Sequence, residues 1–181
     1  MKLITLNIWG GQIYAPLRSF IKQHADRDIL CFQEVYKKAS HKVCTDDAPV
    51  NLDIFSEFEN LLPQHIGFFS PTVNGIYGIA IFLQKEFTIL DQGKIIIHEA
   101  PNYPGIGPTH SRNLQWLRYQ ANGKIYTIMN VHGLWNSLGK IDTPDRIAQS
   151  IKIRNFMDAQ DTPIILCGDF NARPDTKSIA H

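Results

Sequence analysis

Polar residues that could bind a metal ion or a phosphate follow four separate apolar segments of the chain. In chain order they are Asn7, Glu34, Asn130, His132, Asp169 and Asn171. Carboxylate and amide oxygens suit Mg²⁺ or Mn²⁺, and they do not suit a zinc thiolate site. A divalent cation, a carboxylate and a histidine are the groups that phosphoryl hydrolysis needs. The cation neutralises negative charge on the phosphate, and the carboxylate activates water.

The apolar segments that carry these residues have the character of strands. They cover residues 3–9, 28–35, 124–131 and 163–167. In α/β sheets, ligands bind outside the carboxyl ends of the strands. If the four strands are neighbours, their polar residues converge on one pocket. P-loop, Gly-x-Ser-x-Gly and His-Glu-x-x-His signatures are absent from the sequence.

The remaining segments predict a mixed architecture. Helical spacing of apolar residues marks residues 16–25 and 52–62, and strand character marks residues 66–69, 76–83 and 87–97. Residues 113–119 and 124–131 predict a hairpin with Asn122-Gly123 as its turn. Thr143 as N-cap, with Pro144 at the first helical position, predicts a helix that runs to about residue 159. We therefore expect one α/β or α+β domain over residues 1–181, with a mixed sheet.

Composition narrows the class of protein further. The 181 residues include 18 basic and 17 acidic side chains, for a net charge of +1, which is not the strongly basic footprint of many nucleic-acid binders. Three widely spaced cysteines suggest neither a disulfide framework nor a zinc knuckle. The sequence shows no signal peptide and no apolar run of membrane-spanning length, so we expect a cytosolic protein without a membrane or an obligate protein partner.

Four short motifs, in this order, resemble those of the endonuclease/exonuclease/phosphatase family, which includes pancreatic deoxyribonuclease. They are Leu6-Asn7-Ile8-Trp9, Gln33-Glu34-Val35, Asn130-Val131-His132-Gly133-Leu134 and Gly168-Asp169-Phe170-Asn171-Ala172. The resemblance covers residues 3 to about 176. It implies a four-layer sandwich of two packed mixed β-sheets flanked by helices, and Mg²⁺- or Mn²⁺-dependent hydrolysis of a phosphoester.

The resemblance also implies residue roles. Glu34 would hold the metal, with Asn7 beside it or bonded to the attacking water or the phosphate. Asp169 would position or deprotonate the water, and Asn171 would orient the phosphate and support Asp169. His132 would stabilise the transition state. Arg112 falls where related enzymes place an arginine that contacts phosphate.

One departure from the family pattern lies after the last motif. Family members continue for several strands, which normally supply another aspartate and a late Ser-Asp-His-type motif, whereas this chain ends at Ser178-Ile179-Ala180-His181. His181 follows the Gly-Asp-Phe-Asn motif too closely to be that histidine. We therefore expect a C-terminally truncated domain with an incomplete second sheet. A catalytically silent module that binds metal or phosphate is the alternative, and nucleic acid, a small metabolite and a lipid all remain open as substrates.

Several residues also have plain structural interpretations. A lone histidine such as His132 is usually a core residue, and Asn171 could cap a helix that begins near residue 175. Asn130 could contact the substrate or only brace the pocket, and Arg112 could contact phosphate or be a surface charge. For the tryptophans, core packing is the default expectation, although Trp135 could line the mouth of the site.

Overall fold

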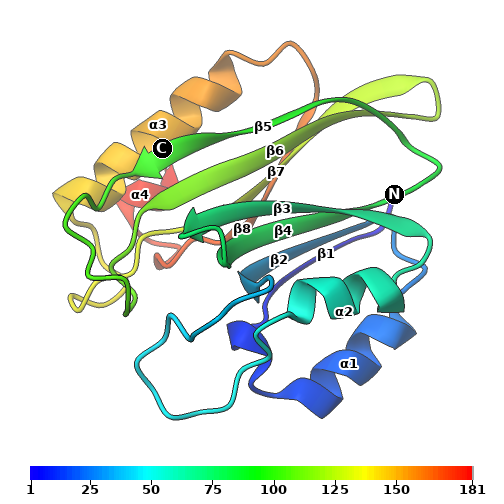
Figure 1. Cartoon of the computed structure of the whole chain (residues 1–181). Coiled ribbons are helices and arrows are strands. Elements are labelled where there is room, and N and C mark those ends of the chain that lie inside the picture. The colour runs from blue at the N-terminus through cyan, green and yellow to red at the C-terminus, as the bar shows by residue number, and fades with distance from the viewer. Residues whose placement is uncertain (181) are drawn as a thin grey trace.

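The computed structural model describes residues 1–180, and His181 lies outside the described residues. These residues form two four-stranded sheets that pack face to face (Figure 1). The first sheet has the order β1 (Leu3–Asn7), β2 (Ile29–Tyr36), β4 (Tyr77–Gln84), β3 (His65–Val73). The second has the order β5 (Thr88–His98), β6 (Arg112–Ala121), β7 (Lys124–His132), β8 (Ile164–Asp169).

Both sheets are mixed, as predicted. β1 pairs in parallel with β2, and β7 pairs in parallel with β8, while the other pairs are antiparallel. Because parallel strands end at the same edge of a sheet, Asn7 lies opposite Gln33 and His132 lies opposite Asp169. Strand pairing therefore gathers the predicted polar residues at one end of the two sheets.

Helices cover the outer faces of the two sheets and complete the four layers. They are α1 (Tyr14–Gln23), α2 (Ile54–Leu61), α3 (Pro144–Asp158) and the short α4 (Lys177–Ala180). In Figure 1, α1 and α2 lie below the first sheet and α3 lies above the second. Within residues 1–180, no helix has the length and apolar character needed to cross a membrane. The four-layer sandwich implied by the resemblance is confirmed, while its single-domain extent and the incompleteness of its second sheet stay predictions.

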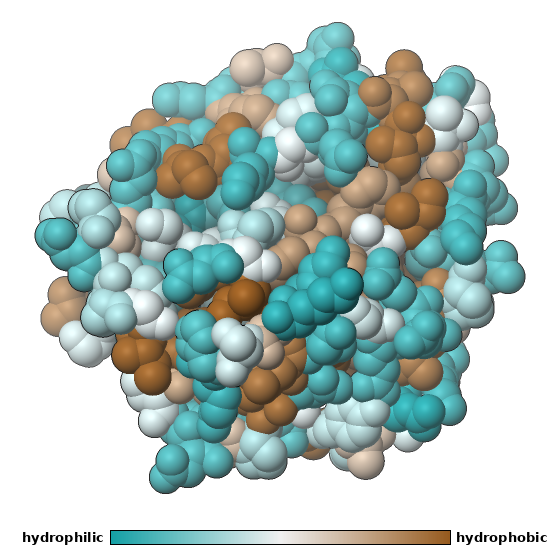
Figure 2. Space-filling view, viewed as in Figure 1, coloured by the Kyte–Doolittle hydropathy of each residue, from teal (hydrophilic) through white to brown (hydrophobic). Residues whose placement is uncertain are grey.

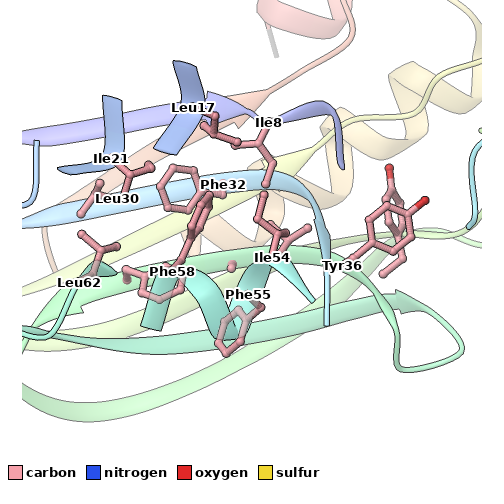
Figure 3. Close-up of a cluster of buried hydrophobic side chains, with 14 of the residues drawn as sticks. Ile8, Leu17, Ile21, Leu30, Phe32, Tyr36, Ile54, Phe55, Phe58 and Leu62 are labelled. Carbon is pink, nitrogen blue, oxygen red and sulfur yellow. The ribbon is translucent and has the colours of Figure 1, made fainter. Parts of the chain in front are cut away.

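Aromatic packing fixes α2 against the first sheet (Figure 3). The ring of Phe32 on β2 lies 4.8 Å from that of Phe58 on α2, and Phe55 on α2 lies 5.2 Å from Phe82 on β4. All four side chains are at most 1% exposed. The apolar face of α2 therefore packs against side chains on the outer face of β2 and β4.

The interface between the two sheets has an apolar part and a polar part. Cys31, Ile81 and Leu117 belong to its apolar cluster. Elsewhere, amide side chains of the second sheet donate to carbonyl oxygens of the first. Asn113 Nδ2 bonds Pro71 O (3.0 Å), Gln115 Nε2 bonds Phe68 O (2.8 Å), and Asn130 Nδ2 bonds both Phe32 O and Ala80 O (3.1 Å each). These bonds are directional, so they fix how one sheet is placed on the other.

The first strand is shorter than the sequence suggests. It ends at Asn7, and residues Trp9–Gly11 form a 3₁₀ turn in which Trp9 and Gly10 have φ of 49° and 59°. The core-packing expectation is wrong for Trp9, which is 52% exposed, because this turn places it outside the sheet.

The face of the molecule in Figure 2 shows hydrophobic residues as separate groups among hydrophilic ones. All three cysteines are free, as predicted.

Candidate active site

Asn7 lies at the centre of the site, between two carboxylates that come from different sheets. Its Nδ2 donates to Glu34 Oε1 (2.8 Å) and to Asp169 Oδ2 (3.0 Å). Its Oδ1 accepts from the backbone N–H of Trp9 (3.0 Å). The opposite amide orientation would place Oδ1 against both carboxylates, which also only accept hydrogen bonds when ionised. Asn7 therefore holds Glu34 and Asp169 together, and its predicted role as a metal ligand stays a prediction.

Glu34 occupies a bulge in β2. The register with β4 shifts between Gln33 and Val35, and Glu34 has a φ of 61°. Positive φ is unfavourable for a residue with a β-carbon, so this conformation is maintained by the surrounding sheet. Burial raises the pKa of the Glu34 carboxyl, and the negative charge of Asp169 raises it further, whereas the amide of Asn7 and the charge of Arg112 lower it. A bound cation would relieve the repulsion between the two carboxylates.

Asp169 is oriented by the residues that follow it. The backbone N–H of Asn171 donates to Asp169 Oδ1 (3.0 Å), and Asn171 Nδ2 donates to Gly133 O (3.1 Å). Asn171 has a φ of 51°, which asparagine tolerates better than most residues. Its support of Asp169 thus has a structural basis. The alternative role as a helix cap is not observed, because the first amides of α4 donate to Asp142 instead.

A glycine is required just before Asp169. A β-carbon at Gly168 would lie 2.0 Å from the backbone oxygen of Val131, and φ at Gly168 is 139°. β7 and β8 therefore approach each other more closely here than any other residue would permit. This contact places Asp169 directly beside His132 in the parallel register.

His132 is buried beside the carboxylates. It is 6% exposed, and its Nε2 lies 3.8 Å from Glu34 Oε1. Burial lowers the pKa of His132 well below its ordinary value of 6.5, and the positive charge of Arg112 acts in the same direction. A neutral imidazole at this position is able to donate one hydrogen bond, or to accept one, without carrying a charge.

Arg112 is buried and not a surface charge. It is 1% exposed, and its Nη2 donates to Pro108 O (2.7 Å) while its Nη1 lies 3.0 Å from His132 Nδ1. The surface-charge alternative is therefore wrong, and its contact with a phosphate stays a prediction. Burial lowers the pKa of Arg112, whereas the negative charges of Glu34 and Asp169 raise it.

Asn130 has the bracing position that its sequence context left open. Besides its two bonds to the first sheet, its Oδ1 accepts from Gln33 Nε2 (2.7 Å), and the residue is fully buried. Gln33 Nε2 also donates to Thr5 (3.2 Å). The side-chain amide of Asn130 is thus hydrogen-bonded within the protein, and its predicted contact with substrate stays a prediction.

The residues around the site enclose a cleft of about 270 Å³. Its lining includes Trp9, Glu34, Tyr77, His110, His132 and Trp135. Trp135 therefore lines the cleft. Tyr77 and His110 were not predicted, because Tyr77 lies in an apolar strand segment and His110 in a loop. The only signal for His110 was its place two residues before Arg112.

The loop that follows His132 is fixed by α3. Arg146 is 1% exposed and its Nε donates to Leu134 O (3.3 Å), while Gln149 Oε1 accepts from Leu134 N (2.9 Å). Arg146 also donates to the carbonyl of Ile141. Both residues therefore connect α3 to the loop that follows His132.

The oxygen donors of Glu34 and Asp169 suit a Mg²⁺-type ion that keeps several water ligands. They do not suit an ion whose ligands all come from protein side chains. Within residues 1–180, His, Cys, Asp and Glu side chains form no group of three or more that could hold a metal. Mg²⁺ usually keeps several waters and is bound through one or two carboxylates together with substrate phosphate. Glu34 and Asp169 provide two carboxylates that share the amide of Asn7.

Comparison with known proteins gives one family and several similar folds. The sequence matches the model of the Endonuclease/Exonuclease/phosphatase family over residues 4–181. A search of curated protein sequences finds no match. One similar solved structure is an endonuclease/exonuclease/phosphatase from Bacteroides vulgatus, with 20% identity and a TM-score of 0.68, covering 98% of this chain and 67% of that one.

Two further solved structures have printed activities or ligands. The mannosyl-6-phosphatase of Bacteroides thetaiotaomicron has 19% identity and a TM-score of 0.70, covering 99% of this chain and 67% of that chain. D. rerio TDP2, complexed with a single-strand DNA product, has 16% identity and a TM-score of 0.69, covering 96% of this chain and 61% of that chain. At these identities the likeness establishes the fold alone. The chain spans about two thirds of the length of these proteins.

Proposed function

The chain belongs to the endonuclease/exonuclease/phosphatase family, and on that premise we propose that it hydrolyses phosphoesters with a divalent cation and a carboxylate-activated water. Endonucleases, exonucleases and phosphatases all hydrolyse phosphoesters, so the family provides the reaction class. The observation that supports the proposal is the amide of Asn7, which holds Glu34 and Asp169 together at 2.8 and 3.0 Å beside a buried His132.

Glu34 is the residue that would hold Mg²⁺ or Mn²⁺, with Asn7 adjacent to it. When bound, the cation would neutralise negative charge on the phosphate. The raised pKa of Glu34 supports this assignment, because a buried carboxylate next to Asp169 is stabilised by positive charge.

The remaining residues act on water and phosphate. In this proposal Asp169 accepts the proton of the attacking water, and the N–H of Asn171 keeps the Asp169 carboxylate oriented. His132 donates a hydrogen bond to a phosphate oxygen, where negative charge accumulates in the transition state. Asn171 lines the cleft and orients the phosphate.

The cleft and the charge of the chain bear on which phosphoesters could be substrates. A small phosphorylated metabolite and a nucleic acid are both consistent with a cleft of about 270 Å³. The net charge of +1 gives nucleic acid no special support. The half-exposed Trp9 at the rim of the cleft offers a flat surface on which a base or a sugar ring could pack. A cytosolic location belongs to the same proposal.

A panel of phosphoesters tests the activity. The purified chain is assayed with Mg²⁺, with Mn²⁺ and with EDTA on bis-p-nitrophenyl phosphate, p-nitrophenyl phosphate, a hexose 6-phosphate and a single-stranded oligonucleotide. We expect metal-dependent hydrolysis of at least one substrate, and a loss of about 100-fold or more in Glu34→Gln and in Asp169→Asn. Glu59→Gln and Asp91→Asn are matched controls, because both residues are exposed and neither lines the cleft.

Two outcomes would contradict the proposal. Hydrolysis that continues in EDTA at the same rate would remove the cation from the reaction. The second outcome is that the chain hydrolyses none of the substrates but still binds Mn²⁺, and that this binding requires Glu34. That result would favour the catalytically silent module.

A further inference from the structure

Arg112 and His132 are in direct contact inside the protein. Arg112 Nη1 lies 3.0 Å from His132 Nδ1, and both residues are buried, with exposures of 1% and 6%. The guanidinium is held from its other end by Pro108 O, which accepts from Nη2 at 2.7 Å. The contact is thus between two fixed groups in the interior of the site.

A guanidinium has five N–H donors and no acceptor. The 3.0 Å contact is therefore a hydrogen bond only if His132 Nδ1 offers its lone pair. A neutral imidazole with a lone pair on Nδ1 carries its single proton on Nε2. The chemistry of arginine, and not an assumption about histidine, thus fixes the tautomer.

The other ring nitrogen lies on the side of the Glu34 carboxylate. His132 Nε2 lies 3.8 Å from Glu34 Oε1, and both residues line the cleft. We infer that Arg112 is a positioning residue that holds His132 as its Nε2–H tautomer, so that the imidazole presents a donor to the cleft. The catalytic meaning of this donor rests on the proposed function, in which it bonds a phosphate oxygen.

Two other buried histidines of the described residues, His65 and His110, serve as internal references. His110 Nδ1 lies 2.8 Å from Ser111 O, and His65 Nε2 lies 2.6 Å from Arg27 O. A carbonyl oxygen can only accept, so His110 carries its proton on Nδ1 and His65 carries it on Nε2. His110 and His132 therefore lie in the same cleft lining with opposite tautomers.

Long-range ¹H–¹⁵N correlation of the ¹⁵N-labelled full chain, without added metal, measures these tautomers directly. We expect His132 and His65 to show a protonated Nε2 and an unprotonated Nδ1, and His110 to show the reverse. In Arg112→Met the donor is lost, and we expect His132 nitrogen shifts to move toward a mixture of tautomers. Arg112→Lys restores a donor and should return the Nε2–H pattern.

Arg146→Met is the matched control. Arg146 is as buried as Arg112 and bonds the same loop at Leu134 O, but it makes no bond to the imidazole. The His132 pattern should therefore survive this substitution. A protonated Nδ1 on His132 in the unchanged protein would overturn the inference, as would an unaltered Nε2–H pattern in Arg112→Met.

The experiment stays decisive if Arg112→Met does not fold, because the unchanged protein alone can contradict the assignment. It is also independent of catalysis. Absence of phosphoester hydrolysis would defeat the proposed function while leaving the tautomer measurable, and a wrong tautomer would defeat this inference while leaving hydrolysis intact.

Discussion

At the scale of single residues, His110 shows how burial changes the response of this protein to acid. It is 2% exposed, and its ring packs edge-on against Tyr77 at 5.4 Å and against Tyr103 at 5.8 Å. Burial lowers the pKa of His110 from 6.5 to about 3, and the charge of Arg112 acts in the same direction. The folded protein therefore keeps this imidazole neutral at a pH at which the unfolded chain binds a proton.

The sign of the pH dependence follows from this shift. Between pH 6.5 and about pH 3, His110 binds a proton in the unfolded state but not in the folded state. The free energy of unfolding therefore falls as the pH falls through that window. In His110→Asn we expect the loss of stability between pH 7 and pH 4.5 to be smaller by about 2–3 kcal/mol. Urea unfolding at the two pH values measures the difference.

His41→Asn is the control, since His41 is exposed. Its loss of stability between the two pH values should equal that of the unchanged protein. An equal loss in His110→Asn would mean that His110 is protonated in the folded state, which contradicts the assigned burial effect.

Sequence patterns predicted which polar residues lie together better than they predicted the hydrogen bonds between them. Asn7, Glu34, His132, Asp169 and Asn171 do converge, because each lies at or near the carboxyl end of a strand and parallel strands share an edge. Hydrogen-bond direction was not predictable in this way. Only coordinates show that Asn7 turns its nitrogen toward the carboxylates.

At the scale of elements, α3 is the part of the fold that local sequence determines most completely. The helix was expected over residues 144 to about 159 and is found over Pro144–Asp158. Thr143 accepts from the N–H of Arg146 at 3.3 Å, as an N-cap should. Cap residues and Pro at the first position act within one turn, so the sequence is sufficient to place the start of the helix.

Thr143→Ala should therefore weaken the protein. We expect the free energy of unfolding to fall by about 1 kcal/mol, because the N–H of Arg146 loses its side-chain acceptor. Thr143→Ser keeps a hydroxyl and should lose only a small part of this. Urea unfolding of the two variants at neutral pH makes the comparison, and equal stabilities would show that the cap does not contribute.

β2 illustrates what local sequence does not determine. The segment was correctly assigned as a strand. The bulge at Glu34, however, depends on pairing with β4, where Gln33 lies opposite Ile79 and Val35 lies opposite Gly78. These partners are about 45 residues further along the chain. No pattern within residues 28–35 encodes that shift. The direction of the Glu34 carboxylate is thus a property of the assembled sheet.

At the scale of the whole molecule, hydrogen bonds from side-chain amides of the second sheet to backbone carbonyls of the first align the two halves of the site. Glu34 belongs to the first sheet, and His132 and Asp169 belong to the second. The four-layer arrangement was implied by family resemblance, whereas the polar part of the interface was not, because Asn113 and Gln115 lie in a segment that reads as an ordinary strand. Their partners are backbone carbonyls, which every residue has.

Asn130→Ala tests this alignment. We expect the free energy of unfolding to fall by roughly 2–3 kcal/mol, since two bonds to the first sheet are lost and Gln33 Nε2 loses a buried acceptor. Asn60→Ala is the control, because Asn60 is exposed on α2, where alanine is the better helix former. Urea unfolding distinguishes them, and equal stabilities would contradict the bracing role.

The hydrogen bond between Asn7 and Asp169 has a consequence for the order of events during folding. It joins residues 162 positions apart, one on the first strand and one on the last described strand. Contacts of such long sequence separation form late and slowly, because the loop between them must close first. No partly folded state that lacks β8 can contain both carboxylates beside Asn7. The proposed cation site therefore exists only after β8 has joined the second sheet and the two sheets have packed together.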